Sequence, residues 1–414
     1  MHAYSTSKQN GTVMKSFRMF TAFFIATLMI SVPTRALTAA TPTAPFNVTV
    51  PMVVENHRPY VDFEITGSNG RRLKAHFYVD TGGGAILLTE SLAKRLGLRT
   101  TGKPFQEGGS ALTPANLPTF SLDHRVLALT GAAAFIVIKA AGGLQGTDAQ
   151  GAFPARALRH YQVVFDYPAR KFTVATPHAL KPEGTPVKTY IGDAGMPVVT
   201  LAVDGASHDF LMDTGGTYCM ISAAQLGIWA KQHPQWPHAS GAYGPANMLV
   251  GPGEVHYEML RIAAMQWGPF ALKHVGAVSR PVNAYEKFMS QIAGKPVIGS
   301  IAGNVLQAFR VDIDYPGDQI YLEHTAGIRD KPLNMVPVIL ELKDRGYVVA
   351  GTAPGMTAIH KGDRLLHVGR LDAQTATLAE IVHALQGKVG IRKNLLIERG
   401  GQRLEIQSRV RLIL

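Results

Sequence analysis

The 414-residue sequence has little cysteine, little charge and no obvious metal-binding motif. Its single cysteine, Cys219, cannot close an internal disulfide, which excludes a disulfide-stabilised scaffold. The 15 histidines form no His-Glu-x-x-His motif or other cluster at metal-ligand spacing, so we predict neither a metal nor a cofactor. Charged residues make up only 17% of the chain, and Gly and Pro are scattered, so neither a disordered chain nor a coiled coil is expected.

Nucleotide-binding motifs are also missing, because the sequence contains no Walker phosphate loop and no dinucleotide fingerprint. The formal net charge is +12, and residues 1–36 contribute four of these positive charges without any acid. For an exported protein this basic balance is poor evidence of a nucleic-acid partner. We therefore predict no nucleic-acid partner.

The N-terminus has the order of a secretory signal peptide. Basic residues precede a mainly apolar run at residues 19–32, and small residues follow it around Ala36. This run of 14 residues is shorter than the roughly 20 needed to span a bilayer. We expect residues 1–36 to be a signal peptide and 37–50 a linker, which makes the mature protein secreted or periplasmic without a membrane span. An uncleaved anchor is the alternative.

Beyond the linker, the chain consists mostly of short β-patterned runs separated by Gly, Pro, Asn and Asp. Residues 60–65 and 75–79 flank a turn sequence and predict a hairpin. Residues 198–203 and 209–212 predict a second hairpin of the same design. A mainly β fold is therefore expected.

The two hairpins begin two copies of one repeated unit. The first leads into Asp80-Thr81-Gly82 and the second into Asp213-Thr214-Gly215. An apolar run follows each motif, and Cys219 in the second run corresponds to Ile86 in the first, which predicts a buried structural cysteine. A short helix is then expected at residues 91–96 and at residues 223–226, the latter ending at Gly227.

Later landmarks support the duplication. Gly151 and Gly299 each lie 15 residues before an Asp-Tyr-Pro sequence, at residues 166–168 and 314–316. The second copy is longer between its landmarks by about 15 residues, which we place within residues 231–253.

A doubled Asp-Thr-Gly motif suits one kind of chemistry. Two carboxylates brought together by pseudo-twofold symmetry share a proton, which leaves one as acid and the other as base. Such a pair can activate water against an amide carbonyl without a covalent intermediate. Threonine can lock one loop to its twin, and glycine lets the backbone turn close to a carboxylate. The alternative is that each motif is only a tight turn.

These motifs, together with Val297-Ile298-Gly299, resemble the pepsin- and retropepsin-like aspartic proteases. The Asp-Tyr-Pro strands resemble the bacterial exported branch, in which such units often precede a PDZ domain. The resemblance covers roughly residues 50–325 and implies two pseudo-symmetric six-stranded β-lobes, at 51–180 and 181–328. The site residues that it implies are the catalytic dyad Asp80 and Asp213, with the supporting loop residues Thr81, Gly82, Thr214 and Gly215.

The sequence departs from the family pattern in two places. Ala149-Gln150-Gly151 stands where two apolar residues usually precede the glycine, which questions the packing beneath Asp80. Gly83 and Gly216 follow the motifs, where pepsin-like enzymes usually have Ser or Thr. Without those hydroxyl donors we expect the pKa values of the dyad to be higher than in a pepsin-like site, with an activity optimum in the weakly acidic range.

A protease of this kind needs a flap over its substrate. Residues 107–110 and Gly241-Ala242-Tyr243-Gly244 have suitable hinge glycines, although either segment could be an ordinary loop.

Residues 329–414 lie outside the repeat and predict a small α+β module. It resembles a PDZ domain of the bacterial type, which implies that it binds an extended peptide or its C-terminus. The residues that match the terminus-binding loop and strand are Arg345, Gly346, Tyr347 and Val348. The alternative is a closed module that only packs against the lobes.

The sequence thus predicts an aspartic endopeptidase that acts on polypeptide substrates and carries a C-terminal PDZ domain. The alternative from another class is an inactive peptide-binding scaffold that acts through the PDZ domain.

Overall fold

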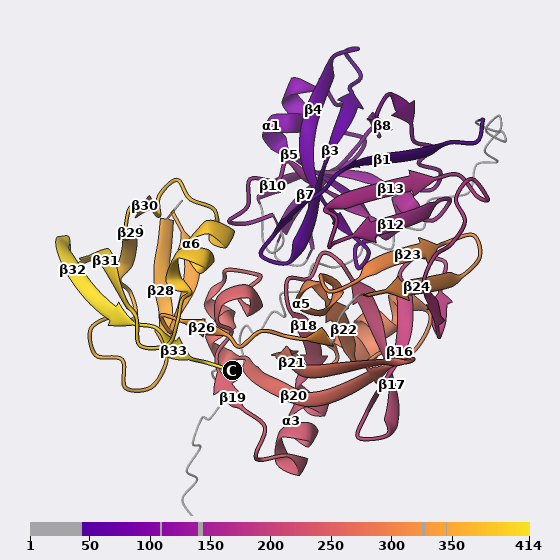
Figure 1. The fold of residues 1–414 in the computed structure, drawn as a ribbon. Coiled ribbons are helices and arrows are strands. Elements are labelled where there is room, and N and C mark those ends of the chain that lie inside the picture. Colours follow the sequence, from indigo (N-terminus) through magenta and orange to yellow (C-terminus); the bar gives the residue numbers. More distant parts are fainter. Residues whose placement is uncertain (1–43, 108–109, 140–143, 325–327, 345) are drawn as a thin grey trace, which may run out of the picture.

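The computed structural model describes residues 44–414, except 108–109, 140–143, 325–327 and 345. This part of the chain forms 33 strands in five sheets with few short helices, so the predicted mainly β fold is confirmed (Figure 1). The expected signal peptide and the first part of the expected linker lie outside the described residues. Among those that are described, no helix has both the length and the apolar character needed to cross a bilayer.

The first repeat unit builds a ten-stranded sheet, which we call lobe 1. Its strands β3 and β4 form the predicted hairpin, with Tyr60 opposite Tyr78. The strands of lobe 1 are β2 (Val53–Glu55), β3 (Arg58–Thr66), β4 (Arg72–Asp80), β5 (Ile86–Thr89), β6 (Phe105–Glu107), β7 (Ser110–Ala115), β8 (Thr119–Leu122), β9 (Arg125–Val126), β10 (Ala134–Lys139) and β11 (Gly151–Pro154).

The second unit builds a nine-stranded sheet, lobe 2. Its hairpin of β16 and β17 places Val198 opposite Leu211. The strands of lobe 2 are β15 (Thr189–Ile191), β16 (Pro197–Val203), β17 (Ala206–Asp213), β18 (Cys219–Ser222), β19 (His238–Ser240), β20 (Glu258–Trp267), β21 (Phe270–Arg280), β22 (Gly299–Ala302) and β25 (Ile328–Arg329).

Strand pairing in the two lobes confirms the internal repeat. In lobe 1, β11 pairs in parallel with β4 and antiparallel with β5, and β5 pairs in parallel with β10. In lobe 2, β22 pairs in the same way with β17 and β18, and β18 with β21. Cys219 opens β18 as Ile86 opens β5, and it is buried as predicted. Both sheets have more strands than the six per lobe that the resemblance implies.

A third sheet joins the lobes. At its centre, β12 pairs antiparallel with β23, so that Val164 lies opposite Asp312, and each strand leads into one of the Asp-Tyr-Pro sequences. The six strands are β1 (Asn47–Pro51), β12 (Gln162–Asp166), β13 (Lys171–Ala175), β14 (Thr185–Val187), β23 (Arg310–Asp314) and β24 (Gln319–Glu323). Because β1 pairs with β13, the expected linker 37–50 runs too far, and residues 47–50 belong to the fold.

The helices are short and cap the sheets. Helix α3 corrects the sequence prediction, because it continues through Gly227 to Gln232 and buries Leu226 and Trp229 on lobe 2. The helical segments are α1 (Glu90–Arg95), α2 (Ala155–Leu158), α3 (Ala223–Gln232), η1 (Gly244–Ala246), η2 (Pro252–His256), η3 (Ala284–Met289), α4 (Ser290–Ala293), α5 (Gly303–Leu306) and α6 (Leu378–Leu385).

The extra residues of lobe 2 lie between α3 and β20. Ser110 of β7 lies 20 positions after Glu90, the start of α1. The equivalent Glu258 of β20 lies 35 positions after Ala223, the start of α3. The difference of 15 residues agrees with the predicted insertion. We call residues 241–257, which include η1 and η2, the insertion.

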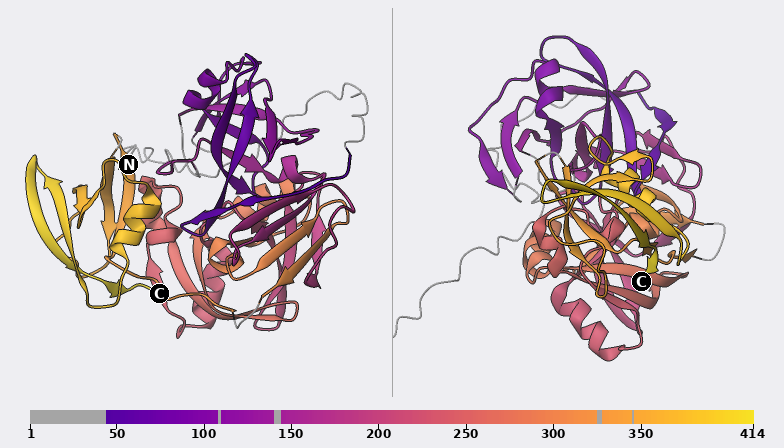
Figure 2. Two further views of the ribbon diagram at one scale, coloured as in Figure 1. Left: turned by 45° about the horizontal axis from the view of Figure 1, so that its top comes forward. Right: turned by 90° about the vertical axis from the view of Figure 1, so that its left-hand side faces the viewer.

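The C-terminal residues form the predicted α+β module, which lies to one side of the lobes (Figures 1 and 2). Its sheet has the order β27-β28-β29-β31-β32, with β30 beside β29, and α6 contacts β29. The strands are β27 (Val338–Lys343), β28 (Gly346–Thr352), β29 (Arg364–Val368), β30 (Leu371–Asp372), β31 (Arg392–Arg399) and β32 (Gln402–Arg409).

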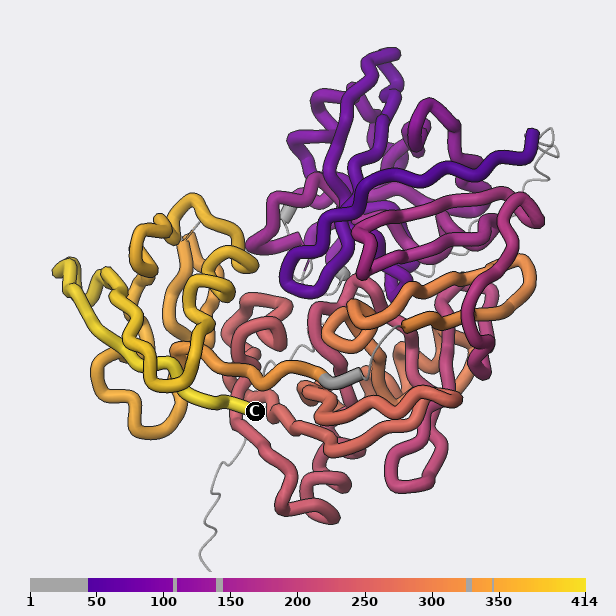
Figure 3. The backbone as a smooth tube through the Cα atoms, viewed as in Figure 1, coloured from indigo at the N-terminus to yellow at the C-terminus, as the bar shows by residue number. Residues whose placement is uncertain are grey.

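The end of the chain returns to lobe 2 (Figure 3). The backbone N–H of Leu333 donates to the Leu414 carbonyl, and Arg261 of β20 donates to the same carbonyl at 3.2 Å. A small ladder of β26 (Asn334–Met335) with β33 (Arg411–Leu412) closes the module there.

Candidate active site

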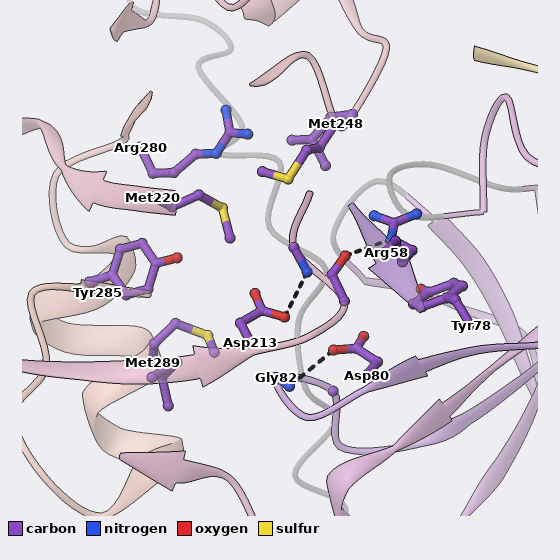
Figure 4. A pocket seen from close by; sticks show the side chains of 15 residues that line it. Arg58, Tyr78, Asp80, Gly82, Asp213, Met220, Met248, Arg280, Tyr285 and Met289 are labelled. Atoms are coloured by element: carbon purple, nitrogen blue, oxygen red, sulfur yellow. Dashed lines mark hydrogen bonds between the residues drawn. The ribbon is translucent and has the colours of Figure 1, made fainter. Parts of the chain in front are cut away.

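The two Asp-Thr-Gly motifs lie at the ends of equivalent strands. Asp80 ends β4 opposite Pro154 of β11, and Asp213 ends β17 opposite Ala302 of β22. Both aspartates line the same pocket, with Asp80 from lobe 1 and Asp213 from lobe 2 (Figure 4). The predicted catalytic pair is therefore brought together.

The threonines lock the two loops to each other. The Thr81 hydroxyl donates to the Met212 carbonyl at 2.5 Å and accepts from the Thr214 N–H at 3.0 Å. Reciprocally, the Thr214 hydroxyl donates to the Val79 carbonyl at 2.7 Å and accepts from the Thr81 N–H at 3.0 Å. Both side chains are fully buried, so these four hydrogen bonds fix the spacing of the aspartates.

The glycines of the motifs are required by the close approach of the opposite carboxyl. A Cβ atom on Gly82 would lie 2.7 Å from the carboxyl carbon of Asp213, and one on Gly215 would lie 2.4 Å from that of Asp80. Each loop also supports its own aspartate, because Gly82 N–H donates to Asp80 Oδ1 at 3.0 Å and Gly216 N–H to Asp213 Oδ1 at 2.9 Å. Any side chain at 82 or 215 would push the dyad apart.

The electrostatics of the site favour a shared proton. The two carboxyls line one pocket, interact electrostatically with each other and are largely shielded by protein. Burial first, and then the negative charge of Asp213, raises the pKa of Asp80 to about 7. Burial also raises the pKa of Asp213, against the donation from Gly216 and the charge of Arg58. The pair therefore holds a proton at weakly acidic pH.

Arg58 is a site residue that sequence reasoning missed. It is 5% exposed, donates from Nε to the Gly215 carbonyl at 2.7 Å, and lies over the Tyr78 ring with its Cζ atom 4.6 Å from the centroid. Its charge lowers the pKa of both aspartates against the effect of burial. No motif marks it, because it begins β3, 22 residues before Asp80.

Lobe 2 has no counterpart of the Arg58 guanidinium at the equivalent position. In the strand registers, Arg58 and Tyr78 of lobe 1 correspond to Met196 and Leu211 of lobe 2. Met196 is fully buried. The two Asp-Thr-Gly motifs are thus identical in sequence but lie in different electrostatic surroundings.

The dyad forms the floor of a pocket of about 90 Å³, which has room for several water molecules. Apolar and aromatic side chains from lobe 2 line most of its walls (Figure 4). They include Met220, Met248, Tyr285 and Met289. Water beside the carboxyls and an apolar side chain along the walls are the groups that such a pocket accepts.

The insertion supplies part of the pocket wall. Met248 lines the pocket, and its Sδ atom accepts from the Thr217 N–H at 3.2 Å. Arg280, also in the wall, forms a buried ion pair with Glu254 of the insertion at 3.4 Å. Burial raises the pKa of Glu254 to about 7, although the charge of Arg280 acts against it.

The unusual Gln150 does not disturb the packing beneath Asp80. Its side-chain oxygen accepts from the His76 N–H at 3.2 Å, while its backbone pairs with His76 and Thr89. Phe153 and Val79 fill the core below the loop and are fully buried. Gln150 is therefore accommodated by hydrogen bonds to a neighbouring strand.

The second flap candidate, residues 241–244, is packed in the core, so the prediction that it is a mobile flap is wrong. Ala242 and Tyr243 are buried in a cluster that also contains Leu333 and Met335 of the C-terminal module. The first candidate remains a prediction: β6 and β7 form a hairpin there, but its turn, residues 108–109, lies outside the described part of the chain.

The predicted terminus-binding residues of the module have other partners. Strand β28, which contains Gly346, Tyr347 and Val348, pairs with β27 along one edge and with β29 along the other. Its backbone is therefore not available to an added strand, and this assignment is corrected. Arg345 lies outside the described residues.

Within the described residues, no three His, Cys, Asp or Glu side chains are placed to hold a metal ion. No known protein-family pattern and no curated protein matches the chain. Among solved structures, the chain is similar to the PDZ domain of a carboxy-terminal protease from Vibrio cholerae, determined in complex with peptide. The two share 18% identity over 19% of this chain and 95% of that one, with a TM-score of 0.18. A similarity this slight carries no conclusion about function.

Proposed function

We propose that this protein is an aspartic endopeptidase in which Asp80 and Asp213 activate a water molecule against a peptide bond. The observation that supports this most directly is the pair of Asp-Thr-Gly loops, interlocked through Thr81 and Thr214, which hold two interacting carboxyls in one pocket. A structural turn needs neither the interlock nor the close approach of like charges.

In this proposal the dyad carries one proton. The ionised carboxylate takes a proton from water as the water oxygen attacks the scissile carbonyl carbon, and the protonated carboxyl donates its proton to the carbonyl oxygen. The resulting neutral diol collapses when one hydroxyl returns its proton to the dyad and the amide nitrogen accepts a proton as the C–N bond breaks. The dyad ends with one proton, ready for the next cycle.

The pocket favours apolar side chains beside the scissile bond. Met220, Met248 and Met289 line it, and methionine adapts its shape to different apolar partners. Arg58 lies on the lobe 1 side, where its positive charge favours the ionised form of the carboxyls. The expected substrate is therefore an extended polypeptide with apolar residues around the cleavage site.

We further propose that the C-terminal module binds polypeptide. Its sheet ends at strand β27, and strand addition, in which an extended chain pairs with the edge of a sheet, suits such a terminal strand. Secretion to the periplasm or outside the cell remains part of this proposal.

The test is to incubate the protein with a mixture of denatured proteins, with and without pepstatin, and to identify new peptide termini by mass spectrometry. The matched control is Asp318→Asn, because Asp318 is exposed and its positive φ of 50° suits asparagine. We expect cleavage between apolar residues by the wild-type protein and by the control, and its loss with pepstatin. Cleavage that pepstatin does not inhibit and that survives Asp80→Asn would refute the proposal.

A further inference from the structure

Strand β27 is the terminal strand of the module sheet, and its outer edge is occupied by the chain itself. The Leu342 N–H donates to the Val250 carbonyl at 2.9 Å, and the Leu340 carbonyl accepts from Asn247 Nδ2 at 2.7 Å. Residues 247–250 of the insertion therefore cover part of the edge at which an added peptide strand would pair, although they form no strand themselves, because Val250 has a positive φ of 48°.

The insertion fills the space between β27 and α6. Its η1 turn contacts α6, and its η2 turn contacts β27 and β28. Val250 is 1% exposed and packs in the same apolar cluster as Ile339 and Ile381. The fit is close, because a Cβ atom on Gly241 would lie 2.3 Å from Ile339 Cδ1. The module's edge and helix thus already hold an apolar segment of the chain.

The same four residues also shape the catalytic pocket. Met248 and Leu249 line the pocket, between the two residues that bond to β27. Thr217, which immediately follows the second Asp-Thr-Gly-Gly sequence, donates from its N–H to Met248 Sδ and from its hydroxyl to the Pro245 carbonyl. A change at the β27 edge must therefore move groups that touch the dyad's surroundings.

We propose that the β27 edge is a binding site for an extended, apolar polypeptide segment, and that residues 247–250 occupy it as an internal ligand. A polypeptide that takes this edge displaces Asn247 and Val250 and withdraws Met248 and Leu249 from the pocket wall. The binding site stands by itself, whereas its effect on catalysis rests on the function proposed above.

The chemistry of the internal ligand defines the partner. It offers a backbone carbonyl to Leu342 and apolar side chains at residues 248–250, which is the chemistry of an unfolded or extended segment of another protein. An internal ligand competes at an effective concentration in the millimolar range. External peptide therefore binds weakly until the internal segment is loosened.

The test uses the full chain with Asp80→Asn, so that binding is measured without cleavage. The probe is a labelled synthetic peptide with the sequence of residues 243–252, and its binding is followed by fluorescence polarisation. Asn247→Ala, which removes one hydrogen bond to β27, is expected to tighten peptide binding about fivefold. The matched control is Ser240→Ala, which removes an exposed hydrogen bond to Glu258 beside the insertion without touching β27, and which leaves the affinity unchanged.

A second measurement does not depend on any change to the insertion. Hydrogen exchange of the Asp80→Asn protein is expected to become faster in residues 245–250 when the peptide is added at saturating concentration. Equal affinity for the Asn247→Ala and unsubstituted proteins, together with unchanged exchange in residues 245–250, would overturn the proposal. If the peptide displaces the segment but the wild-type protein never cleaves a polypeptide, the binding site stands and the protease function fails.

Discussion

At the scale of single residues, the candidate active site is less symmetric than its motifs. Arg58 lies beside the dyad from lobe 1, while the equivalent position in lobe 2 holds the apolar Met196. Burial raises the pKa of both aspartates, and the positive charge of Arg58 lowers it. The position of the proton within the dyad therefore depends on a residue outside both motifs.

Replacing Arg58 tests this dependence. Arg58→Met places in lobe 1 the side chain type found in lobe 2, and it removes the charge that favours ionised carboxylates. Both limbs of the pH profile of kcat/KM are expected to move to higher pH, whereas Arg58→Lys, which keeps the charge, moves them less. Identical profiles for the wild type and Arg58→Met would show that Arg58 acts only in packing.

The raised pKa of Asp80 also predicts how stability depends on pH. The folded protein keeps the proton up to about pH 7, whereas the unfolded chain loses it near the ordinary value of about 4. Between these values the native state binds more protons, so this aspartate lowers the free energy of unfolding as the pH rises.

Asp80→Asn removes this penalty. Its free energy of unfolding relative to wild type is expected to rise between pH 4 and pH 7 by about 2–3 kcal/mol, because the remaining access of the carboxyl to solvent reduces the full linkage value. Denaturant titrations at the two pH values measure this, with Asp318→Asn as the control that shows no such rise. A constant difference between Asp80→Asn and wild type would contradict the raised pKa.

From the sequence, the direction of the pKa shifts of the dyad could be predicted, but the groups that surround the dyad could not. The absence of hydroxyl donors at Gly83 and Gly216 indicates raised pKa values, but backbone N–H groups of Gly82 and Gly216 donate in their place, and burial dominates. A Cβ atom on Gly83 would lie 2.7 Å from Asp80 Oδ2, so a serine there would displace the carboxylate it was meant to support. That collision depends on the folded loop and has no sequence signal.

At the scale of elements, the interlocked loops carry the geometry of the site. Each threonine hydroxyl serves one carbonyl and one N–H of the opposite lobe. Both threonines are fully buried. If a hydroxyl were removed, water could therefore not replace it as the partner of that carbonyl and that N–H.

Thr81→Val keeps the shape of the side chain and removes its hydroxyl. It leaves the Met212 carbonyl and the Thr214 N–H without this partner, which is expected to cost about 2–5 kcal/mol of stability and to reduce kcat. Thr81→Ser retains the hydroxyl and is expected to lose only about 1 kcal/mol. Thermal unfolding and peptide cleavage measure both effects, and equal losses for the two variants would mean that packing, not the hydrogen bonds, holds the loops.

Element predictions succeeded where local turn chemistry decides the structure. The β3–β4 and β16–β17 hairpins both follow from turn residues between β-patterned runs. Helix α3 was predicted too short because Gly227 suggested its end. There, the Ser222 cap and the burial of Leu226 and Trp229 outweigh the cost of an internal glycine.

At the scale of the whole molecule, the module and lobe 2 share one apolar cluster. Tyr243, Ala246 and Val250 from the insertion pack with Leu333 and Met335 from the module. Sequence patterns predicted the order of lobes and module, but they could not predict this docking, because it pairs residues far apart in the chain.

Removing residues 333–414 exposes the lobe 2 side of this cluster. The truncated protein is expected to unfold at a midpoint lower by about 5–10 °C and to aggregate more readily. Differential scanning calorimetry and light scattering measure this. An unchanged midpoint in a soluble truncated protein would show that the module and lobe 2 are energetically independent.

The central claim is that Asp80 and Asp213 form one catalytic unit. Its most direct test compares peptide cleavage by Asp80→Asn, Asp213→Asn and the double variant with that of wild type and Asp318→Asn, all checked for folding by circular dichroism. We predict that each single variant loses as much activity as the double variant, by at least about a thousandfold, while Asp318→Asn retains wild-type activity. Substantial cleavage by either single variant, or losses that add in the double variant, would contradict the shared dyad.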